Sequence, residues 1–293
     1  MIQASLGSTL TQEQTKGSAS SPVLQVRNLT KRFGDGCTFC EKEELEENYC
    51  PRCGSVLACS NVSFDLDKGE ILGVVGESGS GKSTMVKSLY FDQQVTSGSA
   101  TIANYKQGMA NIFTESAQQQ RYIRNYVMGM VYQNPHLGLK MDYSSSGNVA
   151  EKLIAAGHFH VGNIRERSAE LLEKVEIPVS RMDELPRRFS GGMQQRVQIS
   201  KALANNPPLL LLDEVTTGLD LSVQAKVLDL IRSIQRELQV AMVVVSHDLG
   251  VIRMLADRTM VMKQGKVVEQ GLTDQILEDP QHPYTQLLVH SLL

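Results

Sequence analysis

The feature that most constrains the fold is a glycine-rich segment directly after a short apolar run, in EILGVVGESGSGKST. Residues 76–83 fit the phosphate-binding pattern Gly-x-x-x-x-Gly-Lys-Ser. The run ILGVV predicts a buried strand, and KSTMVKSLY predicts a helix whose positive N-terminal end faces an anion. A strand, a glycine-rich turn and a helix in this order predict an α/β domain that binds a nucleotide.

The residue types in this segment suit a triphosphate. Glycines let successive backbone N–H groups point at phosphate oxygens, where a Cβ atom would obstruct them. We expect Lys82 to reach the β- and γ-phosphates of ATP and the Ser83 hydroxyl to hold Mg²⁺. The expected ATP contacts here are Gly76, Glu77, Ser78, Gly79, Ser80, Gly81, Lys82, Ser83 and Thr84.

Five further motifs follow in one order along the chain. They are GMVYQNP with Gln133, SGGMQQR beginning at Ser190, PPLLLLDE ending in Asp213 and Glu214, TTGLD ending at Asp220, and MVVVSHD with His247. Together with the glycine-rich segment, they resemble the ATP-binding cassette (ABC) ATPases across residues 22–293. The resemblance implies an enzyme that hydrolyses ATP to ADP and phosphate, using Mg²⁺.

The resemblance also assigns roles to single residues. Asp213 would hold Mg²⁺ together with Ser83 and Gln133, because a hard cation prefers oxygen ligands. Glu214 would polarise the attacking water, and His247 would contact the γ-phosphate. The catalytic residues expected in this way are Glu214, His247 and Gln133. Phe33, in LTKRF, would stack on adenine.

In this family the SGGMQQR segment acts on a nucleotide held by another subunit. The residues that would contact ATP across such an interface are Ser190, Gly191, Gly192, Gln194 and Asp220. Two ATP molecules would then lie between two chains, in a homodimer or in a heterodimer with a related ATPase. One residue departs from the family pattern, because Val215 replaces the proline that usually follows the Asp-Glu pair. We expect a less rigid turn beside Glu214 and slower turnover.

The same patterns predict the organisation of the chain. Residues 1–21 read as a disordered tail and residues 22–293 as one ABC ATPase domain with a mostly parallel core sheet. VLQVRNLTKRF and SGSATIANY suggest an antiparallel β portion, and residues 134–188 suggest a helical lobe. Within that lobe, Leu171, Leu172, Val175 and Ile177 have helical spacing and predict one buried helix face.

An insert of residues 34–57 interrupts this domain near its start. Cys37, Cys40, Cys50 and Cys53 form two Cys-x-x-Cys pairs, a spacing that favours a structural Zn²⁺ knuckle that replaces a hairpin turn. A disulfide pair and an iron–sulfur cluster remain alternatives. The acidic residues between the pairs suggest a solvated loop or short helix. Cys59 fits neither pair and reads as a small buried apolar residue.

Composition restricts the partners. The net charge of −3 gives no support to nucleic-acid binding, and no apolar run is long enough to span a bilayer. The N-terminal segment lacks the pattern of a secretory signal, so we expect a cytoplasmic protein without direct membrane insertion.

Longer stretches distinguish between groups of ABC ATPases. The stretch from GNVAEKLIAAG to GGMQQRVQI, with LDLSVQAKVLDLIRSI and HDLGVIRMLADR, resembles the ATPases of the carbon–phosphorus lyase system for phosphonate breakdown. That resemblance implies soluble lyase core subunits as partners, which ATP-driven closure would remodel. The C-terminal segment also resembles oligopeptide importers, so the energy-coupling subunit of a peptide- or nickel-type importer is the main alternative. A metal- or redox-regulated ABC protein with another soluble partner is a third.

Overall fold

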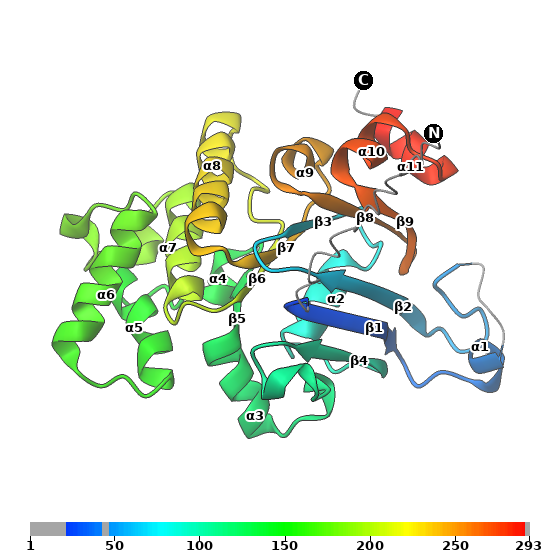
Figure 1. The fold of residues 1–293 in the computed structure, drawn as a ribbon, viewed down its shortest axis with the longest axis horizontal. Coiled ribbons are helices and arrows are strands. Elements are labelled where there is room, and N and C mark those ends of the chain that lie inside the picture. Colours follow the sequence, from blue (N-terminus) through cyan, green and yellow to red (C-terminus); the bar gives the residue numbers. More distant parts are fainter. Residues whose placement is uncertain (1–21, 43–46, 291–293) are drawn as a thin grey trace, which may run out of the picture.

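The computed structural model describes residues 22–42 and 47–290, and it contains two sheets (Figure 1). The larger sheet has six strands in the order β5-β6-β7-β3-β8-β9. Its pairs are parallel except β8 with β9, which is antiparallel. The strands are β3 (Ile71–Val75), β5 (Met128–Val131), β6 (Leu209–Asp213), β7 (Ala241–Val245), β8 (Arg258–Lys263) and β9 (Lys266–Leu272). The predicted, mostly parallel core sheet is confirmed.

The larger sheet has a hydrophobic core on each face. In β6, Leu210 and Leu212 belong to the core shared with the helices, whereas Leu209 and Leu211 belong to the core shared with the second sheet. Side chains alternate between the two faces of a strand, so a strand covered on both sides must be apolar throughout. This requirement explains the uninterrupted leucine run in the sequence.

The second sheet is antiparallel, with the strand order β2-β1-β4. It consists of β1 (Leu24–Phe33), β2 (Val56–Leu66) and β4 (Ser97–Ile102), so the predicted antiparallel portion is present. The cysteine insert connects β1 to β2 and contains the short helix α1 (Thr38–Lys42). Phe33 pairs with Val56 at the end of this hairpin where the insert connects the two strands. The insert therefore takes the place of a hairpin turn, as predicted.

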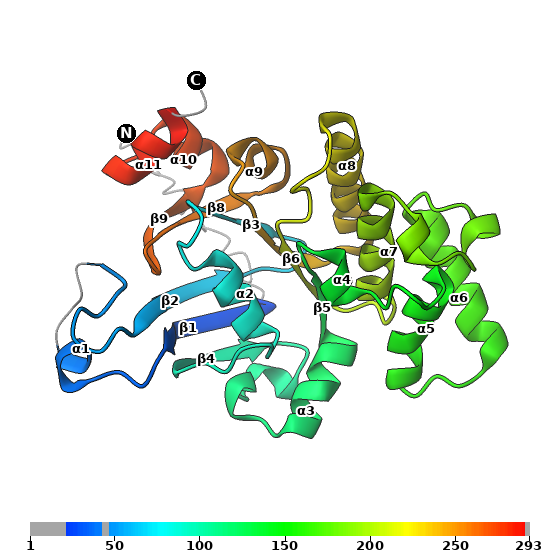
Figure 2. The ribbon, with the colours of Figure 1, turned by 180° about the vertical axis from the view of Figure 1, so that it is seen from behind.

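The helices cover the sheets from several sides. Helix α2 (Lys82–Leu89) follows the glycine-rich segment and packs against strands of both sheets (Figure 2). Helices α5, α6 and α7 gather at the end of the molecule opposite α1 (Figure 1). The other helical bounds are α3 (Ala117–Tyr122), α4 (Pro135–Gly138), α5 (Ser145–Ala155), α6 (Val161–Lys174), α7 (Gly191–Leu203), α8 (Leu221–Leu238), α9 (Leu249–Leu255), α10 (Thr273–Glu278) and α11 (Pro283–His290).

The predicted helix face in the lobe needs a correction. Leu171 and Leu172 lie on α6, but the helix ends at Lys174, so Val175 and Ile177 are outside it. All four side chains are buried as predicted. The chain turns at Glu176, whose φ of +58° lies in the left-handed region, and this turn returns Ile177 to the core. Helices α5 and α6 also pack against α7, which lies beyond the predicted lobe boundary at residue 188.

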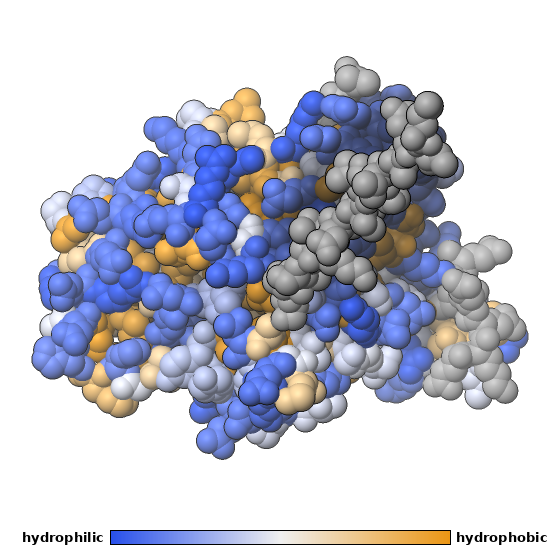
Figure 3. All heavy atoms as spheres, viewed as in Figure 1, coloured by the Kyte–Doolittle hydropathy of each residue, from blue (hydrophilic) through white to orange (hydrophobic). Residues whose placement is uncertain are grey.

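The predicted disordered tail, residues 1–21, lies outside the described part of the chain. Within that part, no helix is long and apolar enough to cross a membrane. The coloured part of the face in Figure 3 is mainly hydrophilic, with apolar groups in separate small areas.

Candidate nucleotide site and cysteine cluster

A cavity of about 370 Å³ lies where β3 and β6 end and α2 begins. It brings together residues that the sequence singled out in four separate parts of the chain. They are Phe33 from β1, the glycine-rich segment, Gln133 after β5 and Glu214 after β6. The cavity is lined by Phe33, Asn48, Val56, Ala58, Ser78, Gly79, Gly81, Lys82, Ser83, Thr84, Gln133 and Glu214.

The glycine-rich segment is a tight loop that only glycine allows at two positions. Gly76 and Gly81 have φ values of +150° and +102°. A Cβ atom on Gly76 would collide with the carbonyl oxygen of Met262, and one on Gly81 with that of Ala58. Gly81 also precedes α2 without a side-chain cap, so the first N–H groups of this helix remain available for an anion.

Lys82 is buried inside this loop, with an exposed fraction of 4%. Its Nζ donates to the carbonyl oxygens of Gly76 and Glu77 at 2.8 and 2.9 Å, and to Ser80 Oγ at 3.4 Å. Burial lowers the pKa of Lys82, while the carboxylates of Glu214 and Asp213 oppose that shift. An ammonium group held mainly by neutral carbonyls lacks a close counter-charge, which a triphosphate would supply.

Ser83 and Asp213 form the oxygen-rich part of the site. The Ser83 hydroxyl donates to Asp213 Oδ1 at 2.7 Å, and Asp213 is 1% exposed. Burial raises the pKa of Asp213, and the Ser83 hydrogen bond and Lys87 counteract this effect. A hydroxyl and a buried carboxylate in contact are donors of the type that Mg²⁺ prefers, so these residues fit the ion that ATP hydrolysis uses.

Glu214 is held by three side chains from three loops. Its Oε2 lies 3.0 Å from Gln133 Nε2, 3.2 Å from Thr217 Oγ1 and 3.2 Å from His247 Nδ1. Its φ of +47° is in the left-handed region, which costs a non-glycine residue about 1 kcal/mol. The three predicted catalytic residues therefore meet around one carboxylate oxygen. Val215 is 2% exposed and packs in the core beside it.

The predicted trans residues do not line this cavity. Ser190 and Gly191 are exposed at the start of α7, and the Ser190 hydroxyl caps the N–H of Met193. Asp220 is exposed at the start of α8, where it caps Val223. Gly192 lies so close to Val223 that a Cβ atom would collide with it, so the two helix starts are neighbours.

The side chain of Gln194, another predicted ATP contact, is hydrogen-bonded to backbone groups of its own chain. Its amide donates to the carbonyl oxygens of Pro186 and Phe189 at 3.0 and 3.1 Å. Its role in ATP binding stays a prediction.

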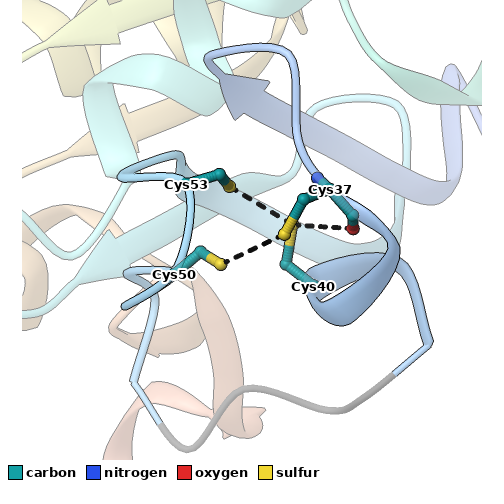
Figure 4. Close-up of side chains that lie close together, drawn as sticks. All are labelled: Cys37, Cys40, Cys50 and Cys53. Atoms are coloured by element: carbon teal, nitrogen blue, oxygen red, sulfur yellow. Dashed lines mark hydrogen bonds between the residues drawn. The ribbon is translucent and has the colours of Figure 1, made fainter.

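The four cysteines of the insert converge on one point (Figure 4). Cys37 precedes α1 and Cys40 lies on it, whereas Cys50 and Cys53 come from the loop that leads into β2. All four sulfur atoms lie within 4.8 Å of one another, and three pairs are 3.8 Å apart. Tetrahedral ligands at the usual zinc–sulfur distance stand about 3.8 Å apart, so the cluster fits one metal ion.

The sulfur–sulfur distances differ from those expected for the two alternatives, a disulfide pair and an iron–sulfur cluster. All five cysteines are free thiols, and 3.8 Å is far longer than a sulfur–sulfur bond. An iron–sulfur cluster of several irons would need thiolates that are farther apart, because its iron and sulfide ions lie between them.

The predicted burial of Cys59 is confirmed by an exposed fraction of 0%, and burial raises the pKa of its thiol to about 12.

Donor groups surround the cluster, as a thiolate site requires. The backbone N–H of Cys37 donates to Cys40 Sγ at 3.1 Å. The Ser55 hydroxyl lies 2.8 Å from Cys53 Sγ, and this hydrogen bond lowers the pKa of Cys53 to about 6. Gly54 has a φ of +74°, which allows the turn between Cys53 and Ser55.

Two residues near the nucleotide cavity carried no motif. Asn48 lines the cavity from between the two cysteine pairs. Tyr284, on α11, accepts a hydrogen bond from the backbone N–H of Glu77 at 2.9 Å. In the sequence, the one signal for Asn48 is its position beside the two cysteine pairs. No local signal relates Tyr284 to a loop more than two hundred residues earlier.

A glycine-rich phosphate loop on a mostly parallel sheet, with Lys82, Ser83, Asp213 and Glu214 beside it, defines a P-loop nucleoside triphosphatase. Residues 59–217 match the family model described as "ABC transporter". Residues 268–293 match "Oligopeptide/dipeptide transporter, C-terminal region". The chain belongs to the ABC transporter family and is an ABC-type ATPase that uses ATP and Mg²⁺.

Several known proteins are similar over most of the chain. The "Putative phosphonates utilization ATP-binding protein PhnK" of Escherichia coli (strain K12) is 46% identical over 94% of this chain and 99% of its own. The "Oligopeptide transport ATP-binding protein OppD" of Bacillus subtilis (strain 168) is 37% identical over 86% of this chain and 71% of its own.

Among solved structures, a dimer of the ATP-binding cassette MJ0796 bound to ADP and Pi has a TM-score of 0.70. It is 29% identical and covers 85% of this chain and 98% of its own.

Proposed function

We propose that this chain is the ATP-hydrolysing subunit of a carbon–phosphorus lyase complex and that it remodels the soluble lyase core during phosphonate breakdown. The observation that carries the proposal is the 46% identity to the E. coli phosphonates utilization ATP-binding protein over nearly the full length of both chains. A cytoplasmic location and soluble lyase subunits as partners follow from this proposal.

The proposed working unit contains two nucleotide-binding chains. Ser190, Gly191 and Asp220 are exposed and do not line the cavity that holds Lys82, although the family resemblance implies that they contact ATP. A second chain, identical or related, would bring these residues to the γ-phosphate, where the exposed start of the 13-residue helix α7 faces negative charge. The dimeric MJ0796 cassette supports this arrangement by likeness.

Within one chain we assign the reacting groups as follows. Lys82 binds the β- and γ-phosphates, Ser83 and Asp213 hold Mg²⁺, and Phe33 stacks on adenine. Glu214 accepts a proton from the attacking water, and its contacts with Gln133 and His247 fix its orientation. Mg²⁺, when bound, neutralises charge on the phosphates. The remaining acceleration comes from positioning, because phosphoryl transfer needs little covalent chemistry from the protein.

We also propose that the four cysteines bind Zn²⁺ as a structural ion. The sulfur–sulfur distances of 3.8 Å and the surrounding donors support a single tetrahedral ion. An insert of this length cannot build a core of its own, so metal binding would supply its folding free energy.

A peptide-importer subunit is the second candidate function. The match of residues 268–293 to the C-terminal region of oligopeptide and dipeptide transporters favours it, as does the 37% identity to the B. subtilis oligopeptide transport protein. In that case the partner would be a membrane permease, and the ATPase chemistry would be the same.

One experiment separates the two functions. A tagged Glu214→Gln variant lacks the proposed base, so we expect it to hydrolyse ATP slowly and keep it bound. Its purification with ATP from detergent-free extract should recover lyase subunits, identified by mass spectrometry. Recovery of permeases, and only with detergent, would favour the importer. Glu237→Gln, which changes an exposed glutamate at the end of α8, is the matched control.

A second experiment tests the two-chain unit. Analytical ultracentrifugation of the Glu214→Gln variant should show a dimer with ATP and a monomer without it. A monomer under both conditions would contradict the homodimer.

A further inference from the structure

We propose that the metal-bound insert forms the wall of the ATP cavity on the side of the base, so that losing the metal weakens nucleotide binding selectively. This inference rests on the ATP site and zinc site proposed above. It assigns the insert a direct part in nucleotide affinity, in addition to closing a hairpin.

The wall consists of three residues that the insert brings together. Phe33 precedes the insert of residues 34–57, whereas Asn48 and Val56 lie inside it, Asn48 two positions before Cys50 and Val56 at the start of β2. All three line the cavity and belong to the antiparallel sheet and its extension, whereas Lys82 and Ser83 begin helix α2.

Backbone contacts connect these residues into a narrow three-stranded ribbon. Val56 is the middle member, since it pairs with Phe33 on one side and with Tyr49 on the other. The N–H of Leu57 donates to the carbonyl oxygen of Asn48 at 2.7 Å. The N–H of Cys50 donates to the carbonyl oxygen of Ser55 at 2.8 Å, and this bond closes the ribbon beside the cysteine cluster.

Among the described residues, the outer part of this ribbon is held mainly by the cysteines and by Arg52, whose guanidinium lies 4.2 Å from the centre of the Phe39 ring. The apolar cluster of the insert contains Cys40 and Cys50 as its buried members, with Phe39 and Leu57 packed against them. A metal ion bound by all four thiolates would tie the α1 side of the insert to the strand that carries Asn48. Without the ion, the described contacts between the two sides of the insert are a small apolar cluster, the contact of Arg52 with the Phe39 ring and isolated backbone bonds, which are marginal in water.

The chemistry of this wall suits an adenine ring. Phe33 is 43% exposed, and Lys31 Nζ lies 4.8 Å from the centre of its ring, so a base would stack on the opposite ring face. Among the described residues, the side chain of Asn48 has no hydrogen-bond partner. An asparagine amide donates and accepts at once, and adenine presents the complementary pair of groups at its edge.

The phosphate side of the cavity does not depend on the insert in the same way. From Ala58 onward, β2 is held by pairing with β1 and by Ser60, whose N–H donates to the carbonyl oxygen of Gly265 at 2.8 Å. The N–H of Gly265 in turn donates to Ser80 in the phosphate loop at 2.9 Å. Loss of the metal should therefore affect contacts with the base and leave contacts with the phosphates in place.

Binding measurements on the full chain test this separation. In a Glu214→Gln background, isothermal titration calorimetry measures Kd for Mg-ATP, Mg-ADP and Mg-tripolyphosphate, which has phosphates but no base. The metal-loaded protein is compared with a Cys50→Ser/Cys53→Ser variant whose metal content is measured. We expect about ten-fold weaker binding of both nucleotides and unchanged binding of tripolyphosphate.

Asn48→Ala in metal-loaded protein provides a second variant, which matters if the cysteine variant fails to fold. It should weaken ATP and ADP several-fold and spare tripolyphosphate, whereas Glu47→Ala, an exposed neighbour outside the cavity, should change nothing. Unchanged nucleotide affinity in both test variants overturns the inference, and so does an equal loss for tripolyphosphate. If the purified protein contains no metal, the proposed zinc site is wrong, and the inference falls with it. If the extract experiment recovers no lyase subunits, only the proposed partner is wrong.

Discussion

The hydroxyl of Tyr284 reaches the phosphate loop from the C-terminal helix α11, and its removal tests whether that helix supports ATP binding. The hydroxyl accepts a hydrogen bond from the N–H of Glu77 at 2.9 Å, and the ammonium of Lys263 lies 4.9 Å from the centre of the ring. Tyr284→Phe removes only the oxygen and keeps the ring for Lys263. Burial raises the pKa of Tyr284, so the hydroxyl is neutral at physiological pH.

The expected magnitude follows from one neutral hydrogen bond. Such a bond contributes about 0.5–1.5 kcal/mol net, because water replaces the lost partner. If this free energy holds the phosphate loop in its binding conformation, its loss raises Kd for Mg-ATP by about two- to ten-fold. The N–H of Glu77 lies at the surface, so we expect a value in the lower part of that range.

The assay is calorimetric titration of Mg-ATP into Tyr284→Phe and its parent, both carrying Glu214→Gln. Tyr143→Phe is the matched control, because its ring is exposed and also lies beside a lysine, while its hydroxyl has no partner among the described residues. Equal Kd values for Tyr284→Phe and the parent would refute the reasoning. An equal loss in Tyr143→Phe would show that the effect is not local.

Two further substitutions test other contacts, and each has a direct measurement. Gly81→Ala places a Cβ atom against the carbonyl oxygen of Ala58, at a backbone φ of +102° that disfavours alanine. We expect calorimetry to show loss of ATP binding and a lower Tm. A variant that binds ATP normally would contradict this. Glu269 accepts hydrogen bonds from the N–H groups of Gln281 and His282 at 2.8 and 3.0 Å, so Glu269→Gln should accelerate hydrogen exchange at both amides at pH 7, whereas Glu278→Gln should not. Burial opposes ionisation of Glu269, but these and neighbouring hydrogen bonds outweigh it and hold its pKa below the ordinary value. Its contribution to stability is therefore present above about pH 4.5 and is lost as the pH falls further through the folded-state pKa. Equal protection of these amides, relative to their intrinsic exchange rates, above and below that range would contradict the assignment.

Much of the core could be predicted from the sequence because its signals are local. The strand Ile71–Val75, the glycine-rich turn and the helix from Lys82 are contiguous, and the structure confirms all three. The leucine run before Asp213 indicated a strand buried on both faces, and β6 is such a strand. Where the local signal was weaker the prediction was wrong, since the helical spacing of Leu171 to Ile177 continued past the true end of α6.

The sequence by itself determined the chemistry of this protein: a phosphate loop with Lys82 and Ser83, a carboxylate pair after a buried strand, and four thiols spaced for a metal. These depend on neighbouring residues, whose spacing is fixed by the covalent chain. Only the tertiary structure decided which groups meet, namely Tyr284 with the phosphate loop and Asn48 with the nucleotide cavity. Such contacts depend on strand order and packing between distant segments, which no local pattern encodes.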